Sequence, residues 1–214
     1  MANLSKREAR RVEIAAAAQA VAARDGAEAA TLRAIAAEAG MAANAVLYYY
    51  RGLAEITAAA VQASSDRFLA RLSEAADPAM SPTVRLASVI NAGTTAGLDD
   101  DASRVLYEYW THSLRDREHR RIQEELTRAQ QMTYEKIITD GLQTGEFFPL
   151  LPPAKIARTL VAQEDGLVMD VLAGTASSDD VLDLVASLAS ALLGIDRDAL
   201  IDRIRSRNFS RLGQ

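Results

Sequence analysis

The sequence predicts an all-α protein. Hydrophobic residues make up 49% of the 214 positions, which is enough to bury a core in one or two domains. Apolar residues recur at helical spacing along most of the chain, and no stretch favours a strand. Only 5% of the residues are aromatic, and the five prolines stand mostly at breaks between helical segments. We therefore expect helices joined by short connections.

The first predicted helix covers residues 5–24, with Ile14, Ala18 and Val21 on its inner face. Gly26 follows it closely. Glycine takes the left-handed conformation that ends many helices at no steric cost. The pattern indicates an arginine-rich amphipathic helix that stops at this glycine.

Residues 31–50 predict two short helices joined by a tight turn. Thr31 suits the N-cap of the first helix, and Gly40 suits the left-handed position at its end. Val46 and Leu47 are the expected apolar anchors of the second helix. Two helices at a steep angle across such a turn form a helix-turn-helix, whose second helix enters the DNA major groove. This stretch therefore predicts DNA binding.

The rest of the chain predicts further helices separated by proline, glycine and acidic residues. Their expected ranges are about 53–75, 82–97, 101–114, 119–144, 154–173, 178–193 and 196–206, with acidic N-cap and first-turn residues at 99–101. We predict a helix-turn-helix head over 1–52, a linking helix over 53–75, and a helical ligand-binding and dimerisation domain over 76–214.

The charge is unevenly distributed. The whole chain carries a net charge of −5, but residues 1–51 hold seven Lys and Arg against five Asp and Glu, which leaves −7 for the remainder. A mildly basic head on an acidic body lets one end meet phosphates. The alternative is ordinary variation in surface charge, since the difference is modest.

Several classes of protein are disfavoured. The chain has no cysteine, no run of eighteen apolar residues and no secretory signal at its start, so we expect a cytoplasmic protein without disulfides or membrane spans. No nucleophile elbow or phosphate-binding glycine loop occurs. His112 and His119 would lie about 10.5 Å apart on a continuous helix, too far to share a metal. The turn expected at 116–118 leaves this distance open, but no third ligand is evident. We expect no enzyme, no metal and no cofactor.

The motifs together carry a family resemblance. The arginine-rich first helix ends at Gly26, Thr31-Leu32 is followed by IAAEAG, and VLYYY closes the second short helix. GLQTGEF precedes the helix at 154–173, which contains EDGL. With these features the chain resembles transcriptional regulators of the tetracycline-repressor (TetR) family over nearly its whole length. The resemblance implies a three-helix DNA-binding head, a helical ligand-binding body, a homodimer formed through helices 154–173 and 178–193, and release from DNA by a small molecule.

Some positions depart from that family's pattern. The family commonly has Ser or Thr at Ala42, Gly at Asn44, Tyr near Leu47, Phe near Tyr50, and a phosphate-contacting Lys near Leu53. Either Arg51 compensates for the absent lysine or the affinity for DNA is lower. The alternative function is therefore a helical small-molecule-binding protein with weakened or lost DNA binding.

The candidate DNA-contacting residues fall into two groups. Phosphate contacts position a protein on DNA, whereas base contacts read the sequence. We expect positioning by Lys6, Arg7, Arg10, Arg11, Thr31, Arg33 and Arg51, and base reading or stacking by Ala42, Ala43, Asn44, Tyr48 and Tyr49. Three consecutive tyrosines spread over about 200° of a helix, so Tyr50 is expected to pack into the head. The alternative for Arg10 and Arg11 is that they form a solvated helix face.

A ligand site is predicted in the body. Glu164 and Asp165 each lie in line with apolar residues of the helix at 154–173, so at least one acid is expected to face apolar surroundings. Tyr107, Trp110 and Tyr134 are expected to share that cavity. An acid among aromatic rings would suit a cationic or amine-bearing effector. The alternative is that these acids make interhelical or dimer hydrogen bonds and that Trp110 is an ordinary core residue.

Overall fold

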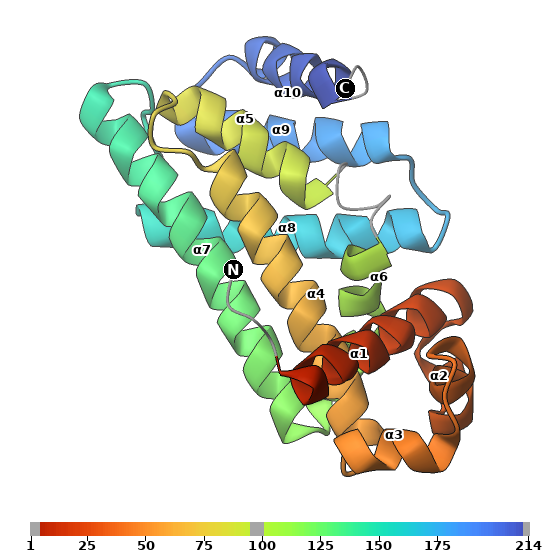
Figure 1. Cartoon of the computed structure of the whole chain (residues 1–214). Coiled ribbons are helices and arrows are strands. Elements are labelled where there is room, and N and C mark those ends of the chain that lie inside the picture. The colour runs from red at the N-terminus through yellow and green to blue at the C-terminus, as the bar shows by residue number, and fades with distance from the viewer. Residues whose placement is uncertain (1–4, 95–100, 212–214) are drawn as a thin grey trace. The chain divides into compact units, whose positions relative to one another are not determined.

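The computed structural model describes residues 5–94 and 101–211 and contains only helices within those ranges. The helices are α1 (Lys6–Asp25), η1 (Ala27–Ala29), α2 (Leu32–Glu38), α3 (Ala43–Tyr49), α4 (Leu53–Ala75), α5 (Pro82–Thr94), α6 (Asp101–Glu108), η2 (Trp110–Leu114), α7 (Arg117–Thr144), α8 (Pro153–Leu172), α9 (Ser178–Leu193) and α10 (Arg197–Arg211) (Figure 1). The predicted all-α fold is confirmed.

The helix predicted over 101–114 is shorter than expected. The helix expected to reach Leu114 ends at Glu108, and a short 3₁₀ helix, η2, continues the chain. Periodicity could not show this, because apolar residues at suitable spacing fit a continuous helix as well as a broken one. The expected end at Gly97 and the expected cap at Asp99 lie outside the described residues.

The chain divides into two compact units. Unit 1 comprises Met1–Phe68 and Asp100–Glu124, and unit 2 comprises Leu69–Asp99 and Glu125–Gln214. The long helices α4 and α7 each contribute residues to both units. The predicted division into a head at 1–52, a link at 53–75 and a body at 76–214 follows the helix-turn-helix pattern instead, and it stays a prediction.

Unit 1 is built around α1, which packs against α2, α3 and α6. Ser5 caps α1 by accepting from the Glu8 amide at 3.2 Å, while the Glu8 carboxylate accepts from the Ser5 amide at 2.8 Å. This reciprocal pair satisfies amides that the first turn leaves without partners. The buried core of the unit includes Ile14, Ala18 and Val21 of α1, Ile35 of α2, and Val46 of α3.

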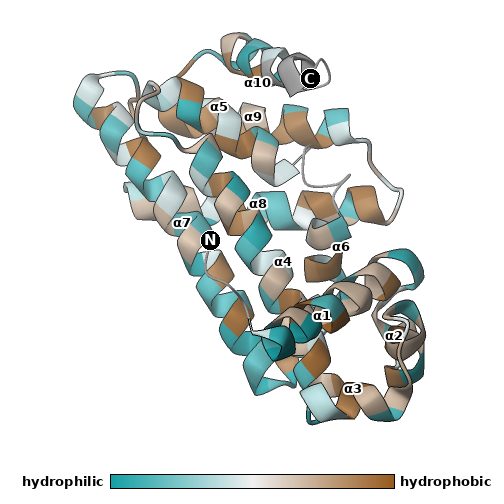
Figure 2. Cartoon of the chain, viewed as in Figure 1, coloured by the Kyte–Doolittle hydropathy of each residue, from teal (hydrophilic) through white to brown (hydrophobic). Residues whose placement is uncertain are grey.

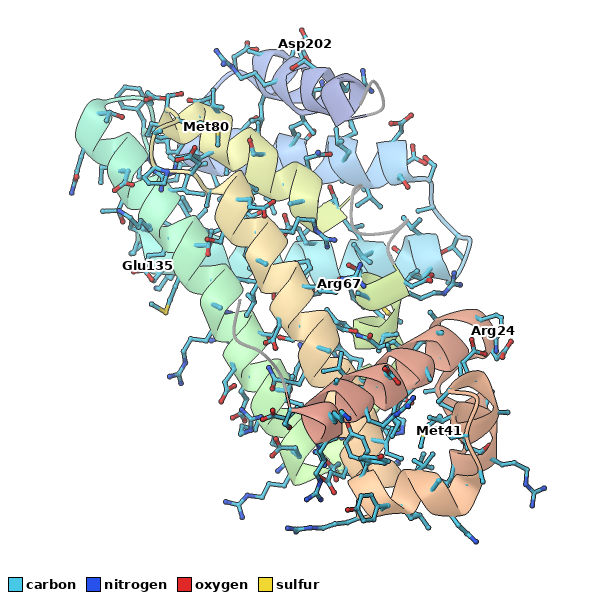
Figure 3. The ribbon with its side chains drawn as sticks, viewed as in Figure 1. Arg24, Met41, Arg67, Met80, Glu135 and Asp202 are labelled. Carbon is cyan, nitrogen blue, oxygen red and sulfur yellow. The ribbon has the colours of Figure 1, made fainter. Side chains whose placement is uncertain are left out.

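The turn between α2 and α3 has the geometry expected of a glycine C-cap. Thr31 caps α2 by accepting from the Ala34 amide at 3.2 Å. Gly40 has a φ of +64°, and the amides of Gly40 and Met41 donate to the carbonyls of Ala37 and Ala36. Figure 3 labels Met41 in this turn. These two hydrogen bonds end α2, and the glycine conformation lets α3 begin in a new direction.

Leu47 does not anchor α3, and that prediction is wrong. Its side chain is 44% exposed, whereas Val46 is fully buried. Consecutive helical residues point about 100° apart, so a helix of two turns that buries Val46 directs Leu47 toward the surface.

Unit 2 is a layered arrangement of helices in which α9 packs against α5, α8 and α10. Its core includes Leu86 and Ile90 of α5, Ile156 and Leu160 of α8, and Val185 of α9. Figure 2 shows α9 as rich in hydrophobic residues and α7 as more hydrophilic. No helix among the described residues is both long enough and apolar enough to cross a lipid bilayer.

Candidate nucleic-acid interface and ligand site

The exposed face of α3 carries polar and aromatic side chains. Asn44 is exposed, Tyr48 is 72% exposed, and Tyr49 is partly exposed. The rings of Tyr48 and Tyr49 meet edge to face with centroids 5.1 Å apart, and the Arg7 guanidinium lies 5.8 Å from the Tyr48 ring centroid. These contacts place an aromatic pair and a cation from α1 on one surface of unit 1.

Most of the predicted positioning residues are also exposed. Lys6, Arg7, Arg10, Thr31, Arg33 and Arg51 lie on the surface of unit 1. Arg10 forms an ion pair with Glu13 one turn further along α1, and the Thr31 hydroxyl serves as the cap of α2. Arg10 can leave Glu13 and bind a DNA phosphate at little cost, since exposed ion pairs contribute little to stability.

Arg11 differs from these residues because its guanidinium is engaged inside unit 1. It donates to the backbone carbonyl of Tyr49 and to the Glu55 carboxylate, the latter at 3.0 Å. The Arg51 amide also donates to Glu55, at 2.8 Å. These hydrogen bonds, with that of the Arg51 amide the largest contribution, lower the pKa of Glu55. Arg11 therefore ties α1 to the end of α3 and the start of α4.

Two departures from the family pattern have local consequences. Ala42 occupies the N-cap of α3, and no side-chain hydrogen bond caps that helix. Ala43 follows it and is partly exposed, while Leu53 is exposed at the start of α4. Neither Ala42 nor Leu53 can make the polar contact expected at its position. At Ala42 this is the capping of α3, and at Leu53 it is a contact to phosphate.

In unit 2, Glu164 is the acid that faces apolar surroundings. It is 3% exposed and accepts a hydrogen bond from the Tyr134 hydroxyl. Burial raises the pKa of Glu164 well above its ordinary value, and burial likewise raises the pKa of Tyr134. Gly93 of α5 lies close by, since a Cβ there would stand 3.1 Å from Oε2 of Glu164. Asp165 is only partly buried.

The aromatic residues predicted to share this cavity belong to different units. Tyr107 and Trp110 lie in unit 1, where their rings stack with centroids 6.1 Å apart. Tyr134, Glu164 and Asp165 lie in unit 2. The pair of Tyr134 and Glu164 is thus the part of the predicted ligand site that one unit brings together.

The two histidines are much closer than a continuous helix predicts. Their ring centroids are 5.6 Å apart, because η2 and the turn at Asp116 interrupt the helix between them. The Tyr109 ring joins them, 4.9 Å from His112 and 5.6 Å from His119. The described residues contain no group of three or more His, Asp or Glu that could hold a metal. The turn expected between the two histidines left their distance open, and local sequence gives no signal for how the chain folds back there.

Known proteins resemble the chain along most of its length. Residues 91–181 match the family model described as the tetracyclin repressor-like C-terminal domain. A curated relative, the HTH-type transcriptional regulator YfiR of Bacillus subtilis, is 27% identical over 181 residues, covering 83% of this chain and 87% of the relative.

Two solved structures show the same fold. A transcriptional regulator from Saccharomonospora viridis in complex with choline has a TM-score of 0.78 at 22% identity, covering 86% of this chain and 96% of that one. SmeT, the repressor of the Stenotrophomonas maltophilia multidrug efflux pump SmeDEF, has a TM-score of 0.69 at 22% identity, covering 86% and 90%.

The helix-turn-helix of unit 1 and the helical domain that follows it define a transcriptional regulator. The family model and the relatives agree on which kind, since the chain is similar to regulators of the TetR family over most of its length. The alternative of a small-molecule-binding protein without DNA binding is not favoured.

Proposed function

We propose that the protein is a repressor that binds a palindromic operator as a homodimer and is released by a small molecule bound in its C-terminal domain. The observation that carries the DNA-binding part is the exposed face of α3, with Asn44 and the Tyr48–Tyr49 pair, beside the cations of α1. In a dimer, two such helices about 34 Å apart would enter successive major grooves.

The exposed residues divide by role in this proposal. Ala43, Asn44, Tyr48 and Tyr49 read bases or stack on the sugar-phosphate backbone, because Asn can pair with adenine and a small alanine can meet a thymine methyl group. Lys6, Arg7, Arg10, Thr31, Arg33 and Arg51 surround them and position the head on phosphates. Arg11 orients the end of α3, since its donors are already engaged by Tyr49 and Glu55.

The outer faces of α8 and α9 support the dimer. Ala162, Gly166 and Met169 of α8 are exposed at helical spacing, and so is Leu184 of α9, with Leu188 half-buried one turn later. Two neighbouring helices that present small and apolar side chains to solvent favour burial against a partner. We assign this face to pairing with the same two helices of a second copy.

Glu164 supports a cationic effector. Its carboxyl group is buried, and the ring and hydroxyl of Tyr134 lie beside it. A cationic ligand would ionise Glu164 and recover the cost of burying the charge through direct pairing. The S. viridis regulator was solved with choline, which is a quaternary ammonium compound. The effector would act by binding the free conformation more tightly than the DNA-bound one.

A gel-shift assay with DNA from upstream of the protein's own gene tests the first part. Tyr48→Ala is expected to weaken binding about tenfold, through loss of stacking worth roughly 1–3 kcal/mol. Arg33→Ala is expected to reduce the salt dependence of binding by about one phosphate contact. Glu74→Ala, an exposed change in unit 2, is the control. Binding that is insensitive to salt, or unchanged in Tyr48→Ala and Arg33→Ala together, would contradict the proposal.

Sedimentation equilibrium tests the dimer. Met169→Glu with Leu184→Glu should convert a dimer to a monomer, because both changes place charge on the proposed interface. Leu142→Glu is the matched control, since Leu142 is an exposed leucine of α7, which is not one of the two helices of the proposed interface. A wild-type chain that is monomeric at every concentration where it binds DNA would rule out the dimer.

Mass spectrometry of ligands that co-purify with the wild-type chain tests the effector. We expect a cationic or amine-bearing compound that is lost from Glu164→Gln and that releases DNA in the gel-shift assay. A co-purified anion that is retained by Glu164→Gln would exclude the cationic effector while leaving the DNA-binding proposal intact.

A further inference from the structure

Unit 1 contains a second cavity, separate from Glu164 and from the exposed face of α3. Its volume is about 420 Å³, and its polar lining comes from Glu28, Thr57, Tyr109, His112, Asp116 and His119. Apolar residues at 27 and 30, and at 53 and 54 in the first turn of α4, complete the wall. A cavity of this size can hold an organic molecule.

Three polar atoms in this lining have no hydrogen-bond partner among the described residues. They are the Tyr109 hydroxyl oxygen, Nδ1 of His112 and Nε2 of His119. Tyr109 is only 3% exposed and His119 only 4% exposed. Most buried polar groups in folded proteins are paired, and each unpaired one raises the free energy of the folded state. These three groups have no partner in the part of the chain that the structure describes, and a molecule bound in the cavity would supply one.

The contact with Asp116 determines which nitrogen of His119 carries the proton. Oδ1 of Asp116 lies 2.8 Å from Nδ1 of His119, and it also accepts from the His119 amide at 2.9 Å. These two hydrogen bonds lower the pKa of Asp116, so its carboxylate is ionised and can only accept. Nδ1 of His119 is therefore the donor, and Nε2 is the ring nitrogen that has no protein partner within the described ranges.

Two carboxylates give this site negative charge. Glu28 and Asp116 both line the cavity. Burial, followed by the charges of Glu108 and Glu28, raises the pKa of Tyr109 to about 12, so the phenol stays neutral at physiological pH. The carboxylates would repel an anion, and a lone pair at Nε2 could not donate a hydrogen bond to it. A cation that carries N–H donors would be attracted and could satisfy that lone pair.

We propose that this cavity binds a small organic ammonium ion with N–H donors, such as a primary amine, which donates to Nε2 of His119 and places its charge near Glu28. The Tyr109 hydroxyl supplies a further hydrogen bond to the ligand. This inference needs neither the operator nor the Glu164 effector site to be correct. An occupant would touch Ala30, which directly precedes the cap of α2, and the start of α4, which directly follows the helix-turn-helix.

The chain contains only two histidines, and both line the cavity. Imidazole ¹⁵N NMR spectra of the untagged full-length protein therefore report on this site alone. In the free protein we expect His119 to show a protonated Nδ1 and an unprotonated Nε2. Benzylamine and n-butylamine should shift the Nε2 signal of His119 saturably at millimolar concentrations, whereas benzyl alcohol, benzoate and phenyltrimethylammonium should not.

Two variants test the contacts of the ligand. Tyr109→Phe keeps the ring and removes a hydroxyl that has no protein partner, so the melting temperature should not fall while benzylamine binding weakens about tenfold. Glu28→Gln should weaken binding about threefold or more, since Glu28 is the exposed carboxylate at the cavity. Glu124→Gln, an exposed change on α7 in the same unit, should leave binding unchanged and controls for general attraction of amines to an acidic protein.

Each other outcome would overturn the proposal in a defined way. Saturable binding of benzoate would make this an anion site with protonated imidazoles. Equal binding of phenyltrimethylammonium would show that N–H donation is not required, and a response to Zn²⁺ alone would make it a metal site. The cavity is not an amine site if neither amine gives a saturable shift. The same conclusion follows if Tyr109→Phe and Glu28→Gln both bind benzylamine with the affinity of the wild type.

Discussion

The Tyr50 hydroxyl donates a hydrogen bond to the backbone carbonyl of Arg11 at 2.9 Å, and the Arg11 guanidinium lies over the Tyr50 ring, 4.0 Å from its centroid. Each residue thereby holds the other in place. Tyr50 ends α3, and Arg11 lies on α1, so this pair fixes how the second helix of the helix-turn-helix leaves the first helix of the chain. Burial raises the pKa of Tyr50, which keeps its hydroxyl a donor at neutral pH.

Tyr50→Phe should therefore lower the free energy of unfolding by about 1 kcal/mol, the usual contribution of one hydrogen bond. Urea denaturation followed by circular dichroism measures this change. Tyr48→Phe is the matched control and should have no effect, because the Tyr48 side chain is largely exposed. Equal stability of the two variants would mean that the Tyr50 hydroxyl does not hold α1 and α3 together.

Asp140→Asn should destabilise the protein by about 3 kcal/mol, because it leaves the buried Arg85 guanidinium without its charged partner. Nζ of Lys136 also lies 3.2 Å from Asp140, but Lys136 is exposed, so Lys136→Met should cost less than about 1 kcal/mol.

The same ion pair predicts a pH dependence. The hydrogen bond from Arg85 makes the largest contribution to lowering the pKa of Asp140. Its stabilising effect is present above the unfolded pKa of the carboxyl group and is lost as the pH falls through the lower folded pKa. Urea titrations across the acid range should show a smaller loss of stability on acidification in Asp140→Asn than in the wild type. Identical pH profiles would contradict this role of Arg85.

Glu164→Gln should stabilise the ligand-free protein at neutral pH, because it removes a buried carboxyl group whose ionised form is disfavoured in the folded state. The folded pKa of Glu164 is raised by burial, so the unfolded chain ionises first and stability is lost as the pH rises from the unfolded toward the folded pKa. Glutamine removes that loss. Thermal melts from acidic to alkaline pH should show a flatter profile for the variant, and a variant less stable than wild type at pH 8 would refute the prediction.

Gly141→Ala should destabilise unit 2 by about 2 kcal/mol, within the usual range for overpacked cores. A Cβ at Gly141 would overlap the Phe147 ring, which is fully buried. Leu142→Ala, at the exposed neighbouring position, should change stability by less than about 0.5 kcal/mol. Chemical denaturation distinguishes the two, and equal effects would show that Phe147 can move aside at little cost.

Much of the fold could be predicted because the signals are local. Thr31 caps α2 and Gly40 closes it, and both effects depend on atoms within a few residues along the chain. The end of α1 near Gly26 follows from the same conformational freedom of glycine. Apolar spacing likewise predicted α8 and α9 to within a residue or so, because a helix repeats every 3.6 residues whatever it packs against.

Features that depend on distant contacts could not be predicted. The residues around Tyr109 have the spacing of a continuous helix, yet the chain breaks there and the His112 and His119 rings come together. Sequence analysis left Glu164 and Asp165 as equal candidates for the acid in apolar surroundings. Packing in unit 2 buries Glu164 against Tyr134 and leaves Asp165 partly exposed.

The sequence by itself determined the all-α fold and the two short helices of residues 31–50, because caps, turn glycines and apolar periodicity act over a few residues. Only the tertiary structure decided that the Arg11 guanidinium hydrogen-bonds to the end of α3 and that Leu47 is exposed. It also decided that two histidines and a tyrosine line one cavity in unit 1. The physical reason is that the burial and pairing of a side chain depend on residues far away in the chain, and local pattern does not encode those positions.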